Sequence, residues 1–337
     1  MANSIEFAKK YTGILDEVYQ RAAVSNCLNS GGNMVRAGRN AKETLIPKIE
    51  VTGLGDYTRN VGYRTGSITW TYETHTFAYD RAIRLFVDVM DVEEAGIIDC
   101  FVQAGAELQR TQVAPEGDAY TFSKIASTEG VTTRTEDLSS ATAEQLLASL
   151  RTVTSAMDER QVSTGSCYLF ITPTLNGVIQ DFSYANPNRS NRVLERFARV
   201  VEVPQLRFYT AIDLLSGDED QFGYRKAEGS YEKTADTEVD SSKTYYAESG
   251  GVYTTVASPT KSGLANYYEL KGAGKDLNFM VVEKSAIIKY AKHLASRVFS
   301  PGELESLDSY MLKYRRYAIC SALENKLDGV YVSAGTE

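Results

Sequence analysis

A long β-hairpin with a glycine-rich tip is predicted in the first quarter of the sequence. Its second strand, residues 67–79, is rich in β-branched and aromatic residues, and Ile68, Trp70 and Tyr72 alternate along one face. The first strand begins around residues 49–54. The tip between the strands contains Gly53, Gly55, Gly62 and Gly66. Such a glycine-rich, polar tip is not expected to be part of a core.

This hairpin needs a surface to lie against. A two-stranded ribbon is only marginally stable in water on its own. The rest of the chain contains almost no residues suited to catalysis. We expect the hairpin to lie on another copy of the same protein.

Several elements are predicted around the hairpin. Residues 4–23 have the apolar spacing of an amphipathic helix, and an irregular segment follows them. A strand that begins at Tyr79 leads to a helix expected from residue 91 to residue 111. Asp91 is its expected N-cap, and we expect the helix to end before Pro115.

The middle of the chain alternates helix and strand. Thr142 and Gln145 have the pattern of a capping box, which opens a second amphipathic helix. Cys167–Ile171 is a short apolar run that is typical of a buried strand. Thr172 and Pro173 then open a short helix.

The C-terminal part also has a strong pattern. Residues 277–282 predict a strand. Ser300, Pro301 and Glu303 are typical of a helix start, so we expect a long helix that ends at Gly329. Residues 330–332 are expected to close the edge of a sheet.

Residues 223–268 differ from their surroundings, because they contain seven tyrosines and few aliphatic residues. A hairpin is predicted within residues 245–253. We interpret the whole segment as a small β insertion. Tyrosine is common in half-exposed strands, so this composition favours ordinary strand packing over a ligand site.

Residues for catalysis or metal binding are scarce. The chain has two histidines, His75 and His293, which is too few for a metal triad or a histidine-activated nucleophile. The segment Gly272–Lys275 lacks the spacing of a phosphate loop and is interpreted as a tight turn. The four cysteines lie far apart in apolar contexts, as reduced core thiols do. We expect no enzymatic activity, no metal and no cofactor.

Charge and hydropathy argue against two further classes of protein, nucleic-acid-binding proteins and membrane proteins. The net charge of −8 argues against a dedicated nucleic-acid-binding protein. The charge is unevenly distributed: residues 1–48 carry seven basic and four acidic side chains, and residues 213–250 carry four basic and ten acidic ones. No apolar run approaches the roughly 18 residues that cross a bilayer. We therefore expect no membrane partner.

The order of these parts resembles that of the major capsid proteins of tailed phages. The resemblance depends on five strings, at residues 79–91, 281–286, 299–301, 314–317 and 324–331. It covers nearly the whole chain apart from the β insertion. It implies an α+β protein with the Hong Kong 97-like capsid fold.

In that fold the chain would be divided into four parts. Residues 1–46 would be an N-terminal arm, and residues 47–80 the extended loop, which is the hairpin. Residues 81–175 would form the peripheral domain with a spine helix at 91–111. Residues 176–337 would form the axial domain with the insertion at 223–268, and parts of 277–300 are allowed to return to the peripheral domain.

The function implied by the resemblance is a structural one. Such a protein assembles as hexamers and pentamers into the icosahedral shell of a tailed phage, in the host cytoplasm, and encloses double-stranded DNA. Portal and scaffolding proteins are expected partners, and a decoration protein is another. Because the chain begins directly with its arm, we expect a separate scaffolding protein or unaided assembly, with noncovalent contacts between subunits.

Two groups of residues are the candidate sites. The extended loop would lie on a neighbouring subunit, and its expected contact residues are Tyr57, Arg59, Tyr63, Arg64, Trp70, Tyr72 and Phe77. The basic N-terminal arm would face the DNA, and its expected residues are Lys9, Lys10, Arg36, Arg39 and Lys42.

Two alternatives remain open. An encapsulin-type nanocompartment shell, which holds an enzyme instead of DNA, would have the same fold, and the sequence does not separate it from a phage capsid. A carbohydrate-binding module that uses the tyrosine-rich insertion is a less favoured alternative, because it leaves the long hairpin unexplained.

Overall fold

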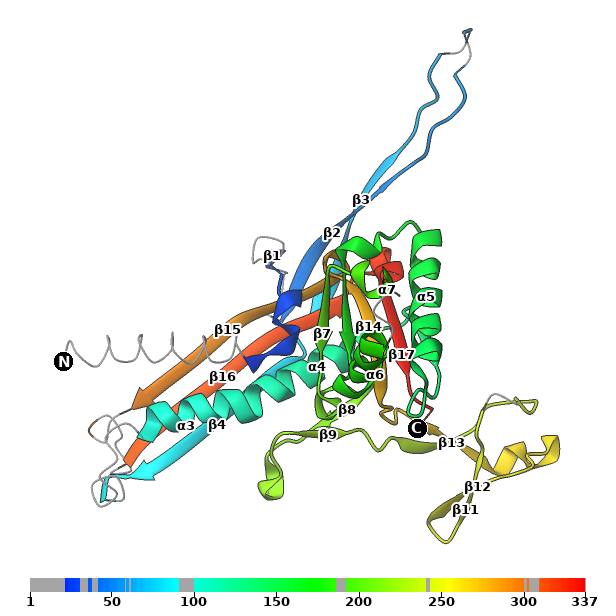
Figure 1. Cartoon of the computed structure of the whole chain (residues 1–337). Coiled ribbons are helices and arrows are strands. Elements are labelled where there is room, and N and C mark those ends of the chain that lie inside the picture. The colour runs from blue at the N-terminus through cyan, green and yellow to red at the C-terminus, as the bar shows by residue number, and fades with distance from the viewer. Residues whose placement is uncertain are drawn as a thin grey trace. The chain divides into compact units, whose positions relative to one another are not determined.

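The computed structural model describes residues 22–30, 36–37, 42–57, 59–60, 62–90, 100–185, 192–240, 243–299, 302 and 309–336. It is an α+β protein whose chain divides into two compact units. Unit 1 contains residues 1–115 and 282–330, and unit 2 contains residues 116–281 and 331–337. Figure 1 shows the elements of both units and labels most of the α-helices and strands.

Unit 1 contains the predicted hairpin, which is confirmed. Strands β2 (Glu43–Val51) and β3 (Ile68–Thr76) pair antiparallel, with Ile49 opposite Trp70 and Val51 opposite Ile68. The short strand β1 (Arg36–Ala37) adds to the other edge of β2 near its start, where it pairs with Thr44 and Leu45. The sheet order is therefore β1-β2-β3.

A second sheet of unit 1 joins segments that are far apart in the sequence. Strand β16 (Ser309–Ala322) lies between β15 (Ile287–Phe299) and β4 (Tyr79–Asp88), and both pairings are antiparallel. Residues 312–318 alternate between a buried face and a more exposed face, in the period of two that is typical of a strand. Short 3₁₀ helices also lie in this unit, at Val24–Leu28 (η1), Lys284–Ala286 (η8) and Glu324–Gly329 (η10).

The expected long helix that ends at Gly329 is therefore wrong. Its apolar residues have helical spacing, but Leu312, Tyr314 and Ala318 also share one face of a strand, and β15 and β4 hydrogen-bond to both edges of that strand. Its expected start at Ser300–Glu303 lies outside the described residues, except for Gly302.

The expected spine helix is longer than predicted. Helix α3 (Cys100–Leu108) continues as a π-helical turn, η3 (Gln109–Val113), and then as α4 (Ala114–Ala126). The expected end before Pro115 is therefore wrong. The π-turn already interrupts the regular hydrogen-bond ladder, and Pro115 is the second residue of α4, where a backbone N–H is not required. The expected start at residues 91–99 and the helix at residues 4–21 lie outside the described residues.

Unit 2 is built on a five-stranded sheet with the order β5-β17-β14-β6-β7. The strands are β5 (Thr132–Thr135), β17 (Val330–Ala334), β14 (Leu277–Glu283), β6 (Cys167–Ile171) and β7 (Arg199–Glu202). Strands β6 and β14 confirm the predicted strands at 167–171 and 277–282. Strand β17 lies one position inside the edge, because β5 pairs in parallel with its outer side.

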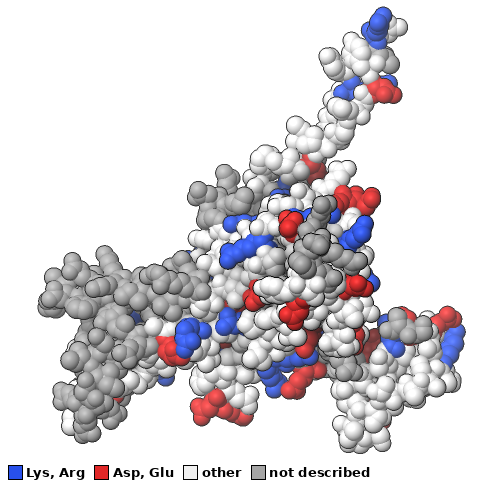
Figure 2. Space-filling model, in the orientation of Figure 1, with Lys and Arg blue, Asp and Glu red and all other residues white. Residues whose placement is uncertain are grey.

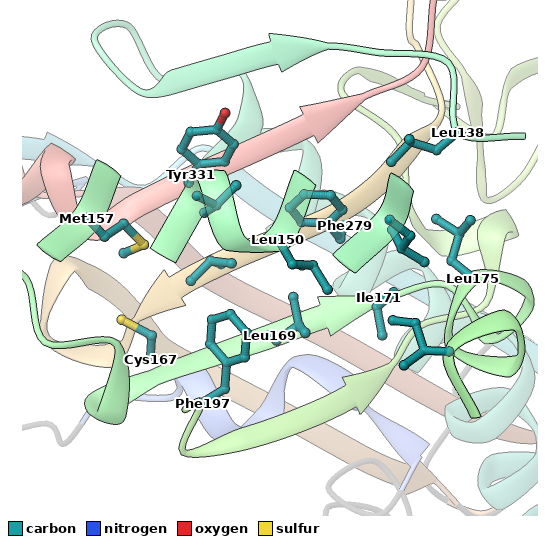
Figure 3. Close-up of a cluster of buried hydrophobic side chains, with 14 residues drawn as sticks. Leu138, Leu150, Met157, Cys167, Leu169, Ile171, Leu175, Phe197, Phe279 and Tyr331 are labelled. Atoms are coloured by element: carbon teal, nitrogen blue, oxygen red, sulfur yellow. The ribbon is translucent and has the colours of Figure 1, made fainter. Parts of the chain in front are cut away.

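Helices α5 (Ala143–Glu159), α6 (Pro173–Ala185) and α7 (Arg192–Glu195) accompany this sheet, and α4 contacts it through Phe122, whose ring lies 5.1 Å from that of Phe170 in β6. The predicted capping box is confirmed, since Gln145 N donates to Thr142 Oγ1 and Thr142 N donates to Gln145 Oε1. The core lies between α5, α6 and the sheet, and Leu150, Leu169 and Phe279 are fully buried in it (Figure 3). Two 3₁₀ turns, η4 (Thr164–Ser166) and η5 (Gln205–Arg207), connect elements of this unit.

The expected β insertion is present in unit 2. A short hairpin of β8 (Ile212–Leu214) and β9 (Tyr224–Lys226) has the 3₁₀ turn η6 (Asp218–Asp220) in its loop. A four-stranded sheet follows, with the order β10 (Ser230–Lys233), β13 (Tyr267–Lys271), β11 (Tyr246–Ser249) and β12 (Val252–Thr255). The 3₁₀ helix η7 (Lys261–Asn266) precedes β13.

The two compact units differ from the expected domain boundaries. Residues 116–175 belong with the later part of unit 2, because β6 and α5 share its core. Residues 282–330 belong with unit 1, because β15 and β16 continue the sheet that β4 begins. These compact units do not coincide with the expected bounds of 81–175 and 176–337, and the division into peripheral and axial domains stays a prediction.

Candidate assembly surfaces

The hairpin of β2 and β3 is anchored at its root by buried apolar residues. Ile46 and Phe77 pack with Ile288 and Ile319, and the ring of Phe77 stacks on Tyr317 with centroids 5.0 Å apart. Phe77 is only 7% exposed. Its expected role as a contact residue of the extended loop is therefore wrong, because its ring is buried against residues of β15 and β16 in its own unit.

Beyond this root, one face of the hairpin is apolar and exposed. Because directly opposed residues of an antiparallel pair share a face, the register places six apolar or aromatic side chains together: Pro47, Ile49, Val51, Ile68, Trp70 and Tyr72. Val51 is 67% exposed, Ile68 is 73% exposed and Trp70 is 57% exposed. We call these six residues the apolar face of the hairpin. Figure 2 shows that much of this ribbon carries no charge.

The opposite face of the same segment is polar. Lys48 lies opposite Thr71 and Glu50 lies opposite Thr69. Lys48 Nζ is 3.2 Å from Glu50 Oε1, so the two charges on this face compensate each other. The hairpin is therefore amphipathic, and such an exposed apolar surface marks an interaction site in a soluble protein.

Where the strands end, the base of the hairpin tip is closed by a backbone hydrogen bond and a hydrogen bond to a side chain, both between Thr52 and Ser67. Thr52 N donates to Ser67 O at 3.1 Å, and Ser67 N donates to Thr52 Oγ1 at 2.9 Å. The rings of Tyr57 and Tyr63 contact each other with centroids 5.1 Å apart, and both side chains are exposed. The remaining expected contact residues, Arg59 and Arg64, are exposed at the same tip.

Substitution of Gly66 tests this closure. A Cβ atom at residue 66 would collide with Thr52 Oγ1, the atom that accepts the hydrogen bond from Ser67 N. We expect Gly66→Ala to displace the Thr52 side chain and to accelerate amide hydrogen exchange across residues 52–67, with less than about 1 kcal/mol lost from the global free energy of unfolding. Unchanged exchange at the tip would contradict the closure. Gly53→Ala is the matched control, because an added Cβ there meets no atom within 4 Å.

The basic N-terminal arm is only partly described. Lys42 is exposed at the start of β2, and Arg36 is in β1. Lys9, Lys10 and Arg39 lie outside the described residues. The expectation that this arm faces DNA stays a prediction.

The four-stranded sheet of the insertion gathers tyrosines on one face. Tyr231 stacks on Tyr253 with centroids 4.0 Å apart, and Tyr246 and Tyr268 contact this pair edge to face. These rings mainly contact one another, which agrees with the interpretation of tyrosine as a half-exposed strand residue.

The other face of this sheet is held by a polar network. Tyr245 is buried, and its hydroxyl donates to Asp236 Oδ2 at 2.7 Å. Lys243 Nζ donates to the same carboxylate at 2.8 Å and lies 3.4 Å from Glu269. The hydrogen bond from Lys243, with that from Tyr245, lowers the pKa of Asp236. These hydrogen bonds and this ion pair stabilise the insertion from within.

A third surface was not anticipated from the sequence. The solvent-facing side of the sheet β15-β16-β4 carries Arg84, Arg297, Lys313 and Arg315, all of which are exposed. Arg315 donates to both oxygens of Asp80, at 2.9 and 2.6 Å, and these hydrogen bonds lower the pKa of Asp80. This surface could not be predicted from the expected helix at 303–329, because only a strand places Lys313 and Arg315 on one face beside Arg84.

Neither a metal centre nor a membrane span is found in the part of the chain that the structure describes. No group of three or more His, Cys, Asp or Glu is placed to hold a metal ion within these residues. Among the described helices, none is both long and apolar enough to cross a bilayer. Cys27, Cys167 and Cys320 are free thiols, as expected.

Comparison with known proteins identifies the fold. No family model and no curated protein matches the sequence. The capsid structure of the cyanophage P-SCSP1u is similar, with 12% identity, a TM-score of 0.55, and coverage of 92% of this chain and 87% of that chain. The mature capsid of bacteriophage PhiM1 has 13% identity, a TM-score of 0.51, and coverage of 88% and 82%. A virus-like particle from Pyrococcus furiosus has 9% identity, a TM-score of 0.51, and coverage of 97% and 99%.

These similarities extend over most of this chain and most of each similar chain. They confirm the predicted fold class, because the chain has the Hong Kong 97-like fold of phage capsid proteins. At 9–13% identity, the similarity establishes the architecture and carries no assignment of individual residues.

Proposed function

We propose that this chain, which has the Hong Kong 97-like fold, is the major capsid protein of a tailed phage. It assembles as hexamers and pentamers into an icosahedral shell that encloses double-stranded DNA. The observation that carries the proposal is the exposed apolar face of the hairpin, because a capsid fold with such a face has a surface suited to a second copy.

The mechanism is geometric. The apolar face of one subunit lies on a different surface of the next, so the contact is heterologous. Such contacts form a closed ring when the rotation between neighbouring subunits is a whole fraction of a full turn. In this scheme the hairpin is the extended loop, residues 81–115 and 282–330 contribute the peripheral domain, and unit 2 is the axial domain. Tyr57, Arg59, Tyr63 and Arg64 extend the contact at the tip.

Portal, scaffolding and decoration proteins are the proposed partners of the shell. The basic arm with Lys9, Lys10, Arg36, Arg39 and Lys42 is proposed to meet the DNA by nonspecific phosphate contacts. The site of action is the virion, and assembly takes place in the host cytoplasm. No residue is proposed as catalytic.

An encapsulin-type nanocompartment shell is the second candidate. The observation that favours it is the match to the Pyrococcus furiosus virus-like particle, which covers 97% of this chain and 99% of that one. Packaged DNA in native particles would favour the phage capsid, and co-purification of one cargo enzyme would favour the nanocompartment. The carbohydrate-binding alternative does not explain the exposed apolar face of the hairpin.

The chain carries its own reporter of assembly, because Trp70 is its single tryptophan. Trp70 is 57% exposed in the subunit, so its fluorescence emission is expected to shift to shorter wavelength as the apolar face becomes covered. We expect this shift to develop in step with light scattering, while electron microscopy of the same sample shows rings, tubes or closed shells.

Two results would contradict the proposal. Particles that form without a shift in Trp70 emission would mean that the hairpin is not covered. A monomer in sedimentation velocity at every protein and salt concentration, and also after co-expression with the neighbouring genes of its source, would remove the assembly function itself.

A further inference from the structure

Three cations form a row across the sheet β15-β16-β4. Arg297 lies directly opposite Lys313, and Lys313 lies directly opposite Arg84. Adjacent strands are about 4.8 Å apart, so the row is about 10 Å long. Like charges that are directly opposed across strands destabilise a sheet. The isolated subunit therefore carries an unfavourable arrangement that an anion would relieve.

No described residue neutralises the row. No ion pair of Arg84, Arg297 or Lys313 is found with another described residue, whereas their neighbour Arg315 is bound to Asp80. Lys313 Nζ lies 4.8 Å above the ring of Phe299 and the Arg84 guanidinium lies 5.4 Å from the ring of Phe86. These rings position the cations but add no negative charge.

A hollow of about 400 Å³ adjoins the row. The sheet surface is recessed here because two small side chains, Ala82 and Ala295, lie on either side of Arg315 on the neighbouring strands. His293 also lines it. The hollow is open to solvent and belongs entirely to unit 1, so it offers a site for an anionic group that comes from outside this sheet.

A matching anionic group is displayed by the loop between β8 and β9. Asp218, Glu219 and Asp220 are consecutive and exposed, and no ion pair of theirs is found among the described residues. Glu219 and Asp220 both have positive φ, of 52° and 58°. Such conformations are costly for residues other than glycine, so this turn holds three carboxylates together at a cost both in backbone strain and in repulsion.

We propose that the acidic loop Asp218–Asp220 of one copy docks on the cation row Arg84–Lys313–Arg297 of a second copy. Each cluster is unfavourable alone, each has three charges, and the charges are opposite, so their contact removes both penalties. Opposite potentials at an interface also fix its register and suppress wrong pairings. The inference rests on the proposed assembly and adds a second contact to that of the hairpin.

Charge exchange tests this contact. The first variant, Arg84→Glu with Lys313→Glu, reverses the row. The second variant, Asp218→Lys with Glu219→Lys, reverses the loop and leaves Asp220 with its positive φ unchanged. Each variant alone is expected to lower particle yield at least about tenfold, because like charges now face each other. The combined variant, with all four substitutions, is expected to restore most of the yield.

Controls separate this inference from the proposed function and from misfolding. Lys124→Glu with Lys284→Glu changes the net charge by the same amount as the row variant, at exposed lysines that are not part of the row, and it should assemble normally. Thermal unfolding of each unassembled variant should match the wild type. Failure of the wild type to assemble counts against the proposed function, whereas assembly of all variants counts against the docking alone.

One further outcome would also overturn the docking. A polyphosphate such as DNA is the other ligand that three cations in a row would attract. If reversal of the row abolishes DNA retention in a filter-binding assay, while reversal of the loop has no effect and gives no rescue, the row is a phosphate site and the contact between copies is wrong.

Discussion

Trp70→Ala is expected to abolish particle formation while the isolated subunit remains as stable as the wild type. Trp70 is 57% exposed and is flanked on its face by Ile68, Tyr72 and the opposed Ile49, so its ring contributes little to the core of its own subunit. When it is covered in an assembly, a tryptophan of this kind typically contributes about 2–4 kcal/mol to one contact. The loss is repeated at every subunit of a shell.

The measurement compares particle yield, by sedimentation and electron microscopy, with the free energy of urea unfolding. Thr71→Ala is the matched control, because it truncates the neighbouring residue on the polar face. The expected pattern is lost assembly for Trp70→Ala and retained assembly for Thr71→Ala. An equal loss of subunit stability and assembly in Trp70→Ala would mean that this side chain is part of an internal core.

Phe77→Ala is expected to have the opposite effect, with a large loss of subunit stability. The ring is 7% exposed, stacks on Tyr317 and lies below Lys292 Nζ at 5.2 Å from its centroid. Truncation of a buried phenylalanine to alanine leaves a cavity and costs about 3–5 kcal/mol. Denaturant unfolding should report this loss before any assembly is attempted.

Tyr72→Ala is the comparison for Phe77→Ala, because Tyr72 is on the apolar face and is 49% exposed. It should unfold with nearly the wild-type midpoint. A Phe77→Ala chain that keeps full stability would show that the root of the hairpin is not anchored by this cluster, and that the core formed by Ile46, Ile288 and Ile319 tolerates its loss.

The hairpin was predictable because its signals are local. Alternation of Ile68, Trp70 and Tyr72 sets the strand, and the glycines around residues 53–66 set the tip. The helix that begins at Ala143 was predictable for the same reason, since its capping box is formed by residues three apart. Neither prediction needs knowledge of distant segments.

The strand β16 was not predictable, because its determinants are distant. Residues 309–322 are compatible with a helical stripe and with strand alternation, and the choice is made by β15 and by β4, which is more than 200 residues away in sequence. The same cause hid the cation row, since Arg84 and Lys313 become neighbours only in this sheet. The exposure of Trp70 followed from the hairpin, whereas the burial of Phe77 depends on packing by Tyr317.

The division into two units has a similar origin. Boundaries predicted along the sequence assume that a domain is continuous, but the chain enters unit 2 after Pro115, returns to unit 1 at Val282 and leaves it again after Val330. These crossings follow from strand pairing between β4 and β16 and between β5 and β17. No local composition signal marks them.

The free strand edges of the hairpin also limit how fast the protein can be synthesised without aggregation. Among the described residues, β1 pairs with β2 only at Thr44 and Leu45, and no strand pairs with the outer edge of β3. Within this part of the chain, most of the hairpin therefore has unpaired backbone groups along both edges. Free edges beside an apolar face are templates for edge-to-edge aggregation. Synthesis that outpaces capture by the correct neighbour should therefore divert subunits into insoluble material, and slower expression should raise the yield of ordered particles.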